Sequence, residues 1–484
     1  FINYDAMQAA INNGTYRFSG MGPSATPASV LATFSYPLYN KPTSSVKLID
    51  FKANRELMNL AGGPLGVAVG AEYRKEDANT PPVPGTDTAS IVGLGYSAFQ
   101  DSRKVYAFFG ELNAPVTKWL ELNGAVRYDH YSDFGSSTTP KLGFKVKPMD
   151  QFAIRGTYSE AFRAPGPAEL HGNSLGFTNV AILTFGNPNI KPEKAKSYTL
   201  GFIAEPLAGT SATVDYWKSN RKNEIIQADP AAISAGNSTG PANSRQPGAI
   251  PNSFLFYDSD GNLSAVSGQF ENANNTKTDG IDIELRHRMN LGSVGKLTAQ
   301  LNWTHVNKFR RTDAFGNTFD YTGTQGPIVQ SSGSGTPKDR ASFSLTLDHG
   351  PWTVTGMVNY VGPLKMIDHK GEMATDNGDG TVSDEANGLV WNYDGTSSLN
   401  CGVYNVTGQP YNRCKLPSFT TFDLYGKWTV FKGFDINVSI QNLFDRKAPF
   451  DPYLPLTYGI NYNQGWHQAG AVGRFFTIGA RYAF

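Results

Sequence analysis

The chain has 484 residues, of which 39% are hydrophobic and 12% aromatic, with 51 Gly and 29 Pro, so it is too apolar for a disordered protein. A formal net charge of +1 and the lack of a concentrated basic face argue against nucleic acid as a partner. No stretch approaches the roughly 18 consecutive apolar residues of a membrane helix. This excludes a helical membrane protein and leaves a membrane β-barrel open, because barrel strands distribute their apolar residues by alternation.

The chain begins with the residues FINYDAMQAAINNG, which show no initiator Met, basic n-region or apolar h-region. We therefore expect no signal peptide in this sequence and interpret residues 1–43 as an extracellular loop that enters the first strand. From residue 44 onward, about fifteen segments alternate apolar and polar residues with the period of a β-strand. We expect these strands near residues 45–60, 66–76, 102–114, 118–131, 138–147, 151–160, 194–206, 210–224, 268–289, 295–309, 338–349, 351–363, 417–430, 433–444 and 471–484.

The alternation is cleanest in residues 433–445. One face of this segment carries the apolar residues Phe434, Ile436, Val438 and Ile440, and the other carries Asp435, Asn437, Ser439 and Gln441. A single strand of this kind equally suits a soluble antiparallel sandwich with one buried face.

The lengths of the connections favour a membrane barrel over a sandwich. Very short connections, near 61–64, 147–150, 207–210, 291–295, 349–351 and 431–433, alternate with long polar ones. The long ones run near 77–101, 161–193, 225–265, 310–337, 364–416 and 445–470, and residues 231–253 among them have the composition of a loop crown. Short turns at one end and long loops at the other are typical of outer-membrane barrels, whose strands face lipid outside and a polar lumen inside. Because bacterial barrels have even strand counts, an odd count predicts that further strands precede this sequence.

Four stretches are more specific than the alternation. They are SEAFRAPGPAELHG at 159–172, NPNIKPEKAKSYTLGF at 187–202, INVSIQNLFDRKAP at 436–449 and VGRFFTIGARYAF at 472–484. In this order they resemble the conserved blocks of TonB-dependent outer-membrane receptors, which import siderophores, vitamins and sugars. The resemblance implies a 22-stranded barrel with an N-terminal plug, energised by TonB. The fifteen strands would then be the last fifteen of the 22 strands, and residues 44–484 would be the C-terminal portion of the barrel. The plug, the TonB box and about seven strands would lie outside this sequence.

The two cysteines, Cys401 and Cys414, lie in one long loop and predict a disulfide that stiffens it, with two buried thiols or a metal pair as alternatives. The seven histidines are scattered and predict no metal site. Nothing in the sequence predicts a catalytic group or a covalently bound cofactor. Any iron would belong to the transported ligand.

Ligand contacts are expected from aromatic residues of the long loops and from a basic pair, because exposed rings stack on sugars, corrins or catechols and cations attract anionic chelates. The candidates are Arg310, Arg311, Trp391, Tyr393, Tyr404, Tyr411, Tyr462, Trp466 and His467. An aromatic belt at the membrane interface, or simple packing within the loops, remains an alternative for each ring.

The final strand predicts an assembly signal. Its apolar face would carry Phe476, Ile478, Ala480, Tyr482 and Phe484 toward lipid, and its terminal aromatic resembles the signal that the barrel assembly machinery recognises. The leading functional hypothesis is TonB-dependent uptake of a small-molecule ligand across the bacterial outer membrane, most commonly a ferric siderophore in this family. Oligosaccharide or cobalamin uptake is the alternative at the level of the ligand, and a passive porin or a barrel adhesin is the alternative class. The expected partners are the TonB complex, through the absent plug, the lipid and lipopolysaccharide of the membrane, and the assembly machinery.

Overall fold

The computed structural model describes most of the chain. The described ranges are residues 1–18, 25–35, 37–88, 90–91, 93–177, 180–228, 230–234, 240–312, 316, 318–326, 334–365, 375–376, 381–384, 389–392, 415–451 and 461–483. No helix in these ranges is long and apolar enough to cross a membrane.

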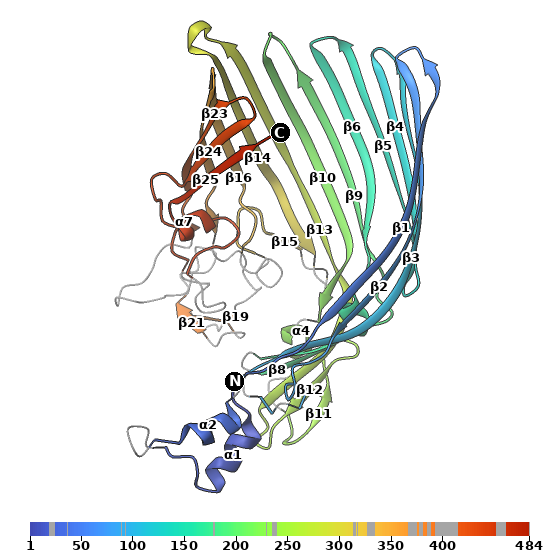
Figure 1. Ribbon diagram of the computed structural model, residues 1–484. Coiled ribbons are helices and arrows are strands. Elements are labelled where there is room, and N and C mark those ends of the chain that lie inside the picture. Colours follow the sequence, from blue (N-terminus) through green and yellow to red (C-terminus); the bar gives the residue numbers. More distant parts are fainter. Residues whose placement is uncertain are drawn as a thin grey trace.

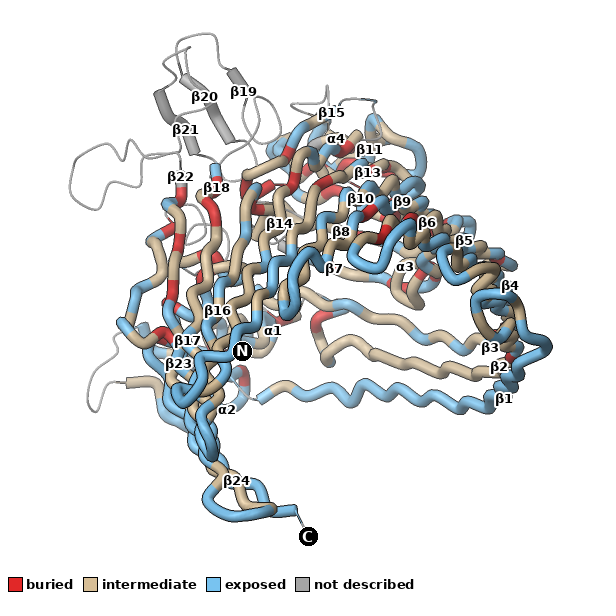
Figure 2. The backbone as a smooth tube through the Cα atoms, turned by 90° about the horizontal axis from the view of Figure 1, so that it is seen from above, coloured by how far each residue is buried: buried red, intermediate tan, exposed pale blue. Residues whose placement is uncertain are grey.

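Fifteen long strands form the body of the molecule, and each coincides with a strand expected from the alternation. They are β1 Thr43–Leu60, β2 Gly63–Thr80, β3 Tyr96–Thr117, β4 Leu120–Tyr131, β5 Gly135–Met149, β6 Phe152–Arg163, β9 Glu193–Ala204, β10 Thr210–Gln227, β13 Leu263–Asn290, β14 Lys296–Thr312, β16 Asp339–His349, β17 Trp352–Val361, β23 Phe419–Phe431, β24 Phe434–Gln441 and β25 Phe475–Tyr482. Each pairs antiparallel with the next of these strands along the chain, which gives one sheet. The sheet curves strongly, as Figures 1 and 2 show.

The sheet is the wall of a β-barrel that does not close on itself within the described residues. There β1 pairs only with β2, and β25 pairs only with β24. The expected segregation of connections is confirmed: the turns at 61–62, 118–119, 150–151, 291–295, 350–351 and 432–433 lie at one end, at the top in Figure 1. Nearly all connections at the opposite end, the loop end, are long, and only the turn at 132–134 is short.

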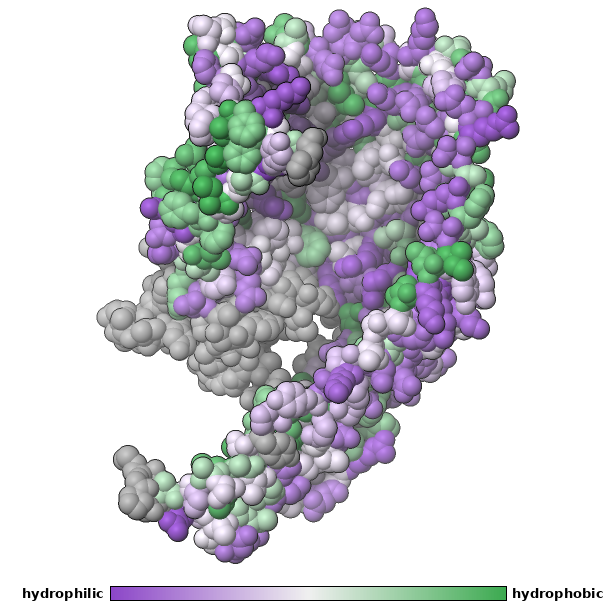
Figure 3. All heavy atoms as spheres, viewed as in Figure 1, coloured by the Kyte–Doolittle hydropathy of each residue, from purple (hydrophilic) through white to green (hydrophobic). Residues whose placement is uncertain are grey.

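The two faces of the sheet differ in chemistry, because residues directly opposite each other on neighbouring strands share a face. One row across β16, β17, β23, β24 and β25 consists of Leu347, Val354, Gly426, Val438 and Ile478. The adjacent row on the other face consists of Thr346, Thr355, Tyr425, Ser439 and Thr477. In Figure 3 hydrophilic and intermediate residues line much of the hollow of the sheet, and hydrophobic residues gather over β23 to β25. The apolar side is the outer face, and the polar side is the inner wall.

Residues 1–43, interpreted from the sequence as a loop, contain two helices at the loop end, α1 Tyr4–Asn12 and α2 Ala28–Phe34, and Thr43 already belongs to β1 (Figure 1). The side chain of Asn3 caps α1 by accepting a hydrogen bond from the Ala6 amide at 2.9 Å. The amide of Tyr4 donates to the carbonyl of Ser90 at 2.7 Å, which ties the segment to the connection between β2 and β3.

A second sheet stands on the loop end of the wall. It joins the first residues of β3 and β13 to β7 Asn173–Phe177, β8 Ala181–Phe185, β11 Arg245–Pro247 and β12 Phe254–Tyr257. A small hydrophobic core forms beneath it from Ala228, Ile233, Leu255, Tyr257 and Val266, with Ile233 contributed by α4 Pro230–Ser234. The described part of residues 231–253 is therefore packed against its neighbours.

The remaining short elements also lie in the long connections. They are α3 Pro167–His171, β15 Thr318–Asp320, β18 Leu364–Lys365, β19 Thr375–Asp376, β20 Thr381–Asp384, β21 Leu389–Asn392, β22 Lys415–Leu416 and α7 Gln468–Val472.

Candidate functional site on the inner wall and the loop end

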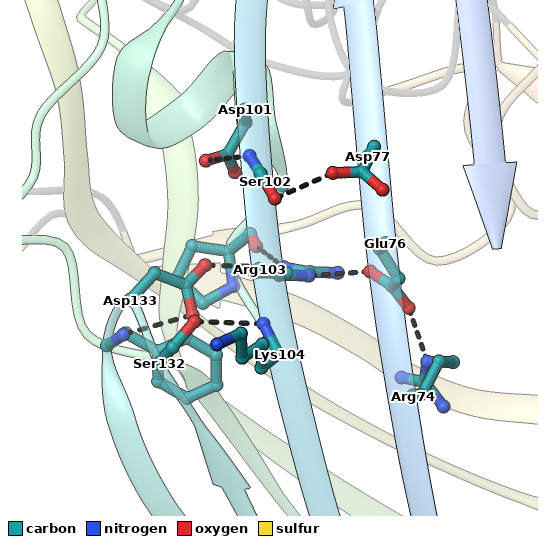
Figure 4. A network of polar contacts seen from close by, with 12 residues as sticks. Arg74, Glu76, Asp77, Asp101, Ser102, Arg103, Lys104, Ser132 and Asp133 are labelled. Atoms are coloured by element: carbon teal, nitrogen blue, oxygen red, sulfur yellow. Dashed lines mark hydrogen bonds and ion pairs between the residues drawn. The ribbon is translucent and has the colours of Figure 1, made fainter. Parts of the chain in front are cut away.

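Charged residues of the inner wall form a network across β2, β3 and β4 (Figure 4). Arg74 donates to Glu72 at 2.6 Å and to Glu76 at 2.5 Å, and Glu76 also accepts from Arg103 at 2.6 Å. On β4, Arg127 pairs with Asp129 at 2.9 Å and reaches Glu72 at 3.3 Å. Arg74 therefore bridges two carboxylates of its own strand, whereas Arg103 and Arg127 link β3 and β4 to carboxylates of β2.

A second network continues around the wall from β6 to β14. Arg163 pairs with Glu169 and with Glu193, both at 2.9 Å, and Glu193 also accepts the backbone amide of Ile225 at 2.9 Å. Arg221 pairs with Glu224 at 2.9 Å. Glu224 in turn lies 3.6 Å from Arg311 of β14.

The two networks meet on the segment before α3. Arg103 of β3 donates to the carbonyl of Pro165 at 2.8 Å, two residues beyond Arg163. Figure 2 shows α3 inside the curve of the wall. We call the joined networks the inner-wall belt; its members are Glu72, Arg74, Glu76, Arg103, Arg127, Asp129, Asp133, Arg163, Glu169, Glu193, Arg221, Glu224 and Arg311.

The belt is nearly neutral. It holds six arginines and seven carboxylates, and every arginine in it has a carboxylate partner. Arginine suits this role because its planar guanidinium can bind two carboxylates at once without losing its charge. The belt makes the wall hydrophilic, but it does not provide free cations that would attract an anionic ligand over a distance.

The belt also explains two of the motifs on which the family resemblance rests. Arg163 belongs to the first motif and Glu193 to the second, and their ion pair joins the end of β6 to the start of β9. The third and fourth motifs are joined similarly, because Asp445 accepts the amide of Arg474 at 3.0 Å. Asn442, buried and with a φ of 49°, holds the turn before Asp445 by bonding to the carbonyl and the amide of Arg446.

On the short-turn side of the belt, the wall between β1 and β5 has a recess of about 510 Å³. Its polar lining comes from Lys52, Asn54, Glu111, Arg127 and Thr139, and Phe109 supplies an aromatic ring. The described residues contain no group of three or more His, Cys, Asp or Glu side chains that could hold a metal ion.

Two long connections are fastened together at the loop end. Trp466, in the connection between β24 and β25, donates its indole N–H to the carbonyls of Ser334 at 2.7 Å and Gly335 at 3.2 Å. The side chain of Asn463 donates to the same Ser334 carbonyl at 3.1 Å. The guanidinium of Arg340 lies 4.7 Å from the centre of the Trp466 ring. We call these contacts the loop latch.

His467 lies next to the latch and has no exposed surface. Its ring meets Phe419 edge-on at 5.2 Å, and in the described part of the chain neither ring nitrogen has a hydrogen-bond partner. Burial therefore lowers the pKa of His467 to about 4, because the charged imidazolium would lose its hydration without gaining a partner.

The structure separates the predicted basic pair. Arg311 is buried in the inner-wall belt, whereas Arg310, its neighbour on β14, points to the outer face and pairs with Asp320 at 3.0 Å. Both have carboxylate partners.

Of the predicted aromatic ligand contacts, the structure describes three. Trp466 and His467 contact other parts of the protein in the latch region, and Tyr462 is half-buried close by in the sequence. The other residues predicted for ligand binding, the disulfide and the assembly signal lie outside the described residues. They are the side chain of Trp391 and the residues Tyr393, Tyr404, Tyr411, Cys401, Cys414 and Phe484. Tyr482 lies opposite Phe434 on the outer face. A role for any of these residues in ligand binding, disulfide formation or assembly stays a prediction.

The inner-wall belt was not predicted from the sequence, although one sequence pattern indicates part of it. Glu72, Arg74 and Glu76 follow one another at alternate positions, so that opposite charges share the polar face of one strand. The contacts of Arg163 with Glu193 and of Arg311 with Glu224 join residues tens of positions apart, and no local pattern indicates them.

The curved antiparallel sheet, with its apolar outer face and polar inner wall, is the wall of a β-barrel, and comparison with known families agrees. Residues 3–443 match the family model described as "TonB dependent receptor-like, beta-barrel", and the chain belongs to this family.

Among its relatives are two curated transport proteins. The ferric enterobactin receptor PirA of Pseudomonas aeruginosa is 25% identical over 181 residues, which cover 33% of this chain and 24% of PirA. The vitamin B12 transporter BtuB of Vibrio cholerae is 29% identical over 96 residues, which cover 20% of this chain and 14% of BtuB.

The fold is similar to that of solved siderophore receptors. PirA of Acinetobacter baumannii superposes with a TM-score of 0.59 at 15% sequence identity, over 96% of this chain and 57% of that protein's chain. A variant of the ferric enterobactin receptor PfeA of Pseudomonas aeruginosa, solved with enterobactin, gives a TM-score of 0.61 at 15% identity, over 95% and 56% of the respective chains. This chain thus spans little more than half the length of these receptors.

Proposed function

We propose that the chain is the barrel portion of an outer-membrane receptor that imports a scarce small molecule, using energy that the TonB complex supplies. The ligand would enter from the loop end, pass along the polar inner wall, and be released to the other side without covalent chemistry. The plug and the segment that contacts TonB would lie outside residues 1–484. The observation that carries the proposal is the curved sheet itself, with an apolar outer face and a continuous polar belt on its inner wall.

A ferric siderophore is the first candidate ligand, because two of the relatives are named as receptors for ferric enterobactin. The inner-wall belt does not select for it by charge, since all six arginines of the belt are paired with carboxylates. Selection would therefore come from the loops. Cobalamin is the second candidate, supported by the similarity to BtuB.

The test uses the full-length receptor, purified without added ligand, and mass spectrometry of the small molecules that remain bound. Cells that express it as their only receptor of this type are then supplied with radiolabelled ferric siderophore or cobalamin, with and without TonB. We expect a retained iron chelate and uptake that stops when TonB is removed. A retained corrinoid would select the second candidate. Uptake that continues without TonB would identify a passive porin and reject the proposal.

A further inference from the structure

The outer face carries a repeated pattern of tyrosine followed by lysine. In four strands an outer-face tyrosine has a lysine two residues nearer the loop end. The pairs are Tyr73 and Lys75, Tyr106 and Lys104, Tyr198 and Lys196, and Tyr216 and Lys218. Tyrosine is typical of the membrane interface, with its ring in the apolar layer and its hydroxyl in the headgroup region. The lysines therefore lie at headgroup depth on the loop side of the membrane.

These lysines lie close to one another across the strands. On β1, β2 and β3, Lys47, Lys75 and Lys104 stand directly opposite one another in a single row. Like charges opposite each other on a sheet destabilise the pairing. Asp77 relieves part of this cost, because it pairs with Lys75 at 3.1 Å, and anions from outside the sheet would neutralise more of the row.

The densest group surrounds Asn220 on β10. Lys218 and Lys222 precede and follow it on the same face of the strand, and Lys196 and Lys277 lie directly opposite it on β9 and β13. Lys194 lies opposite Lys222. We call these five lysines the Asn220 lysine cluster. Because neighbouring strands are about 4.8 Å apart, one headgroup can reach several of them.

The lysines of the cluster outnumber the carboxylates directly opposite them. These carboxylates are Asp279 of β13, opposite Lys218, and Glu160 of β6, opposite Lys196. Lys194, Lys218, Lys222 and Lys277 are exposed, and none forms an ion pair within the described residues, whereas Lys196 pairs with Glu160 at 2.9 Å. The side-chain oxygen of Asn220, at the centre, also has no hydrogen-bond partner there. This contrasts with the inner-wall belt, where every arginine is paired. Among the described residues, the cluster thus presents four cations without an ion-pair partner on the outer face.

We propose that the Asn220 lysine cluster binds the phosphate groups of lipid headgroups in the loop-side leaflet, which in an outer membrane are those of lipopolysaccharide. This inference rests on the proposed outer-membrane placement. The long lysine side chains extend their ammonium groups toward the phosphates while their methylene stems cover the apolar surface beside the tyrosines. The amide N–H groups of Asn220 donate to sugar or phosphate oxygens of the same headgroup, and its oxygen accepts from a sugar hydroxyl.

The test compares lipid binding by two matched double variants of the full-length receptor. Lys222→Gln with Lys277→Gln removes two exposed charges from the cluster. Lys141→Gln with Lys145→Gln removes two exposed charges from the inner wall that have no ion-pair partner in the described part of the chain. The probes are bisphosphorylated lipid A, dephosphorylated lipid A and inorganic phosphate. Binding to the receptor in detergent is measured by native mass spectrometry.

We expect the cluster variant to bind bisphosphorylated lipid A about 25-fold more weakly, which is about fivefold for each lysine near an anionic leaflet. The control variant should bind like the wild type, and dephosphorylated lipid A should not distinguish the three proteins. Inorganic phosphate should compete only at high concentration, because it lacks the acyl chains that contact the outer face.

Equal binding by the wild type and the cluster variant would overturn the inference, and so would equal losses in both variants. Displacement of lipid A by low concentrations of inorganic phosphate would identify a free-phosphate site instead. Insertion of the receptor into lipid vesicles is measured in parallel. Insertion without phosphate-dependent binding refutes only this inference, whereas a receptor that never inserts refutes the membrane placement as well.

Discussion

At the scale of single residues, His467 is a polar, titratable side chain in a fully buried position. Its position in a long polar connection predicted an exposed ligand contact, but the structure buries its ring against Phe419. An imidazole with two unpartnered buried nitrogens destabilises its surroundings. It is tolerated because the neutral ring packs like an aromatic residue.

The buried ring predicts an acid-sensitive connection between β24 and β25. The folded-state pKa of about 4 lies below the ordinary value of 6.5, so between these pH values the unfolded segment binds more protons than the folded one. Stability contributed by this residue is therefore fully present above about pH 6.5 and falls as the pH drops toward 4, by at most about 3 kcal/mol. Hydrogen exchange of residues 461–472 at pH 7 and pH 5 measures this loss, with residues 254–257 as the internal control.

The substitution His467→Leu removes the titrating group and fills a similar volume. We expect the exchange of residues 461–472 in this variant, corrected for the intrinsic effect of pH, to be the same at pH 5 and pH 7. Equal protection of the wild-type segment at the two pH values would contradict the assignment of a lowered pKa to this histidine.

At the scale of elements, the sequence was sufficient for the strands of the wall but not for the structure of the loop end. All fifteen long strands alternate between lipid and lumen, and this alternation is a local pattern. The second sheet is different, because β8 pairs in parallel with residues 265–269 of β13, some 80 positions away in the chain. Such pairings depend on tertiary contacts, which the composition of residues 231–253 does not reveal.

The candidate site, too, was predictable from the sequence only in part. The polar face that carries the inner-wall belt follows from alternation, but the pairing of Arg163 with Glu193 and of Arg311 with Glu224 does not. Arg310 and Arg311 looked like one basic patch in the sequence. On a strand, however, consecutive residues point to opposite faces, and the structure places one on each side of the wall.

The loop latch predicts that the connections β14–β16 and β24–β25 open together. The variant Trp466→Phe keeps an aromatic ring beside Arg340 but removes the N–H that bonds to Ser334 and Gly335. We expect hydrogen exchange to rise about fivefold in residues 334–338 as well as in residues 461–472, as loss of about 1 kcal/mol of hydrogen bonding implies. Exchange in β11 and β12 should not change. A rise confined to residues 461–472 would show that the two connections move independently.

At the scale of the whole molecule, a single rule organises the wall: one face of the long strands is mainly apolar and the other is mainly polar. The rule extends from Phe51 and Ala71 at one edge, through Leu200 and Val214 in the middle, to Ile478 at the other edge. It also constrains how the sheet can exist in a membrane. Unpaired backbone groups are too costly in hydrocarbon, so the free sides of β1 and β25 need partner strands wherever this wall spans a bilayer. The proposed receptor would supply them.

The two-face rule makes a sharp prediction for neighbouring residues of β24. Val438 lies on the outer face in the middle of the strand, in one row with Val354 and Ile478, whereas Ser439 lies on the inner wall in one row with Thr355, Tyr425 and Thr477. An arginine placed at Val438 must face hydrocarbon, which costs about 2–4 kcal/mol near the middle of a bilayer, whereas an arginine at Ser439 can extend into the lumen. We therefore expect Val438→Arg to lower the free energy of unfolding in lipid vesicles by that amount and Ser439→Arg to change it by less than about 1 kcal/mol. If the two variants were equally stable in vesicles, or if the order were reversed, the assignment of the outer face to lipid would be wrong.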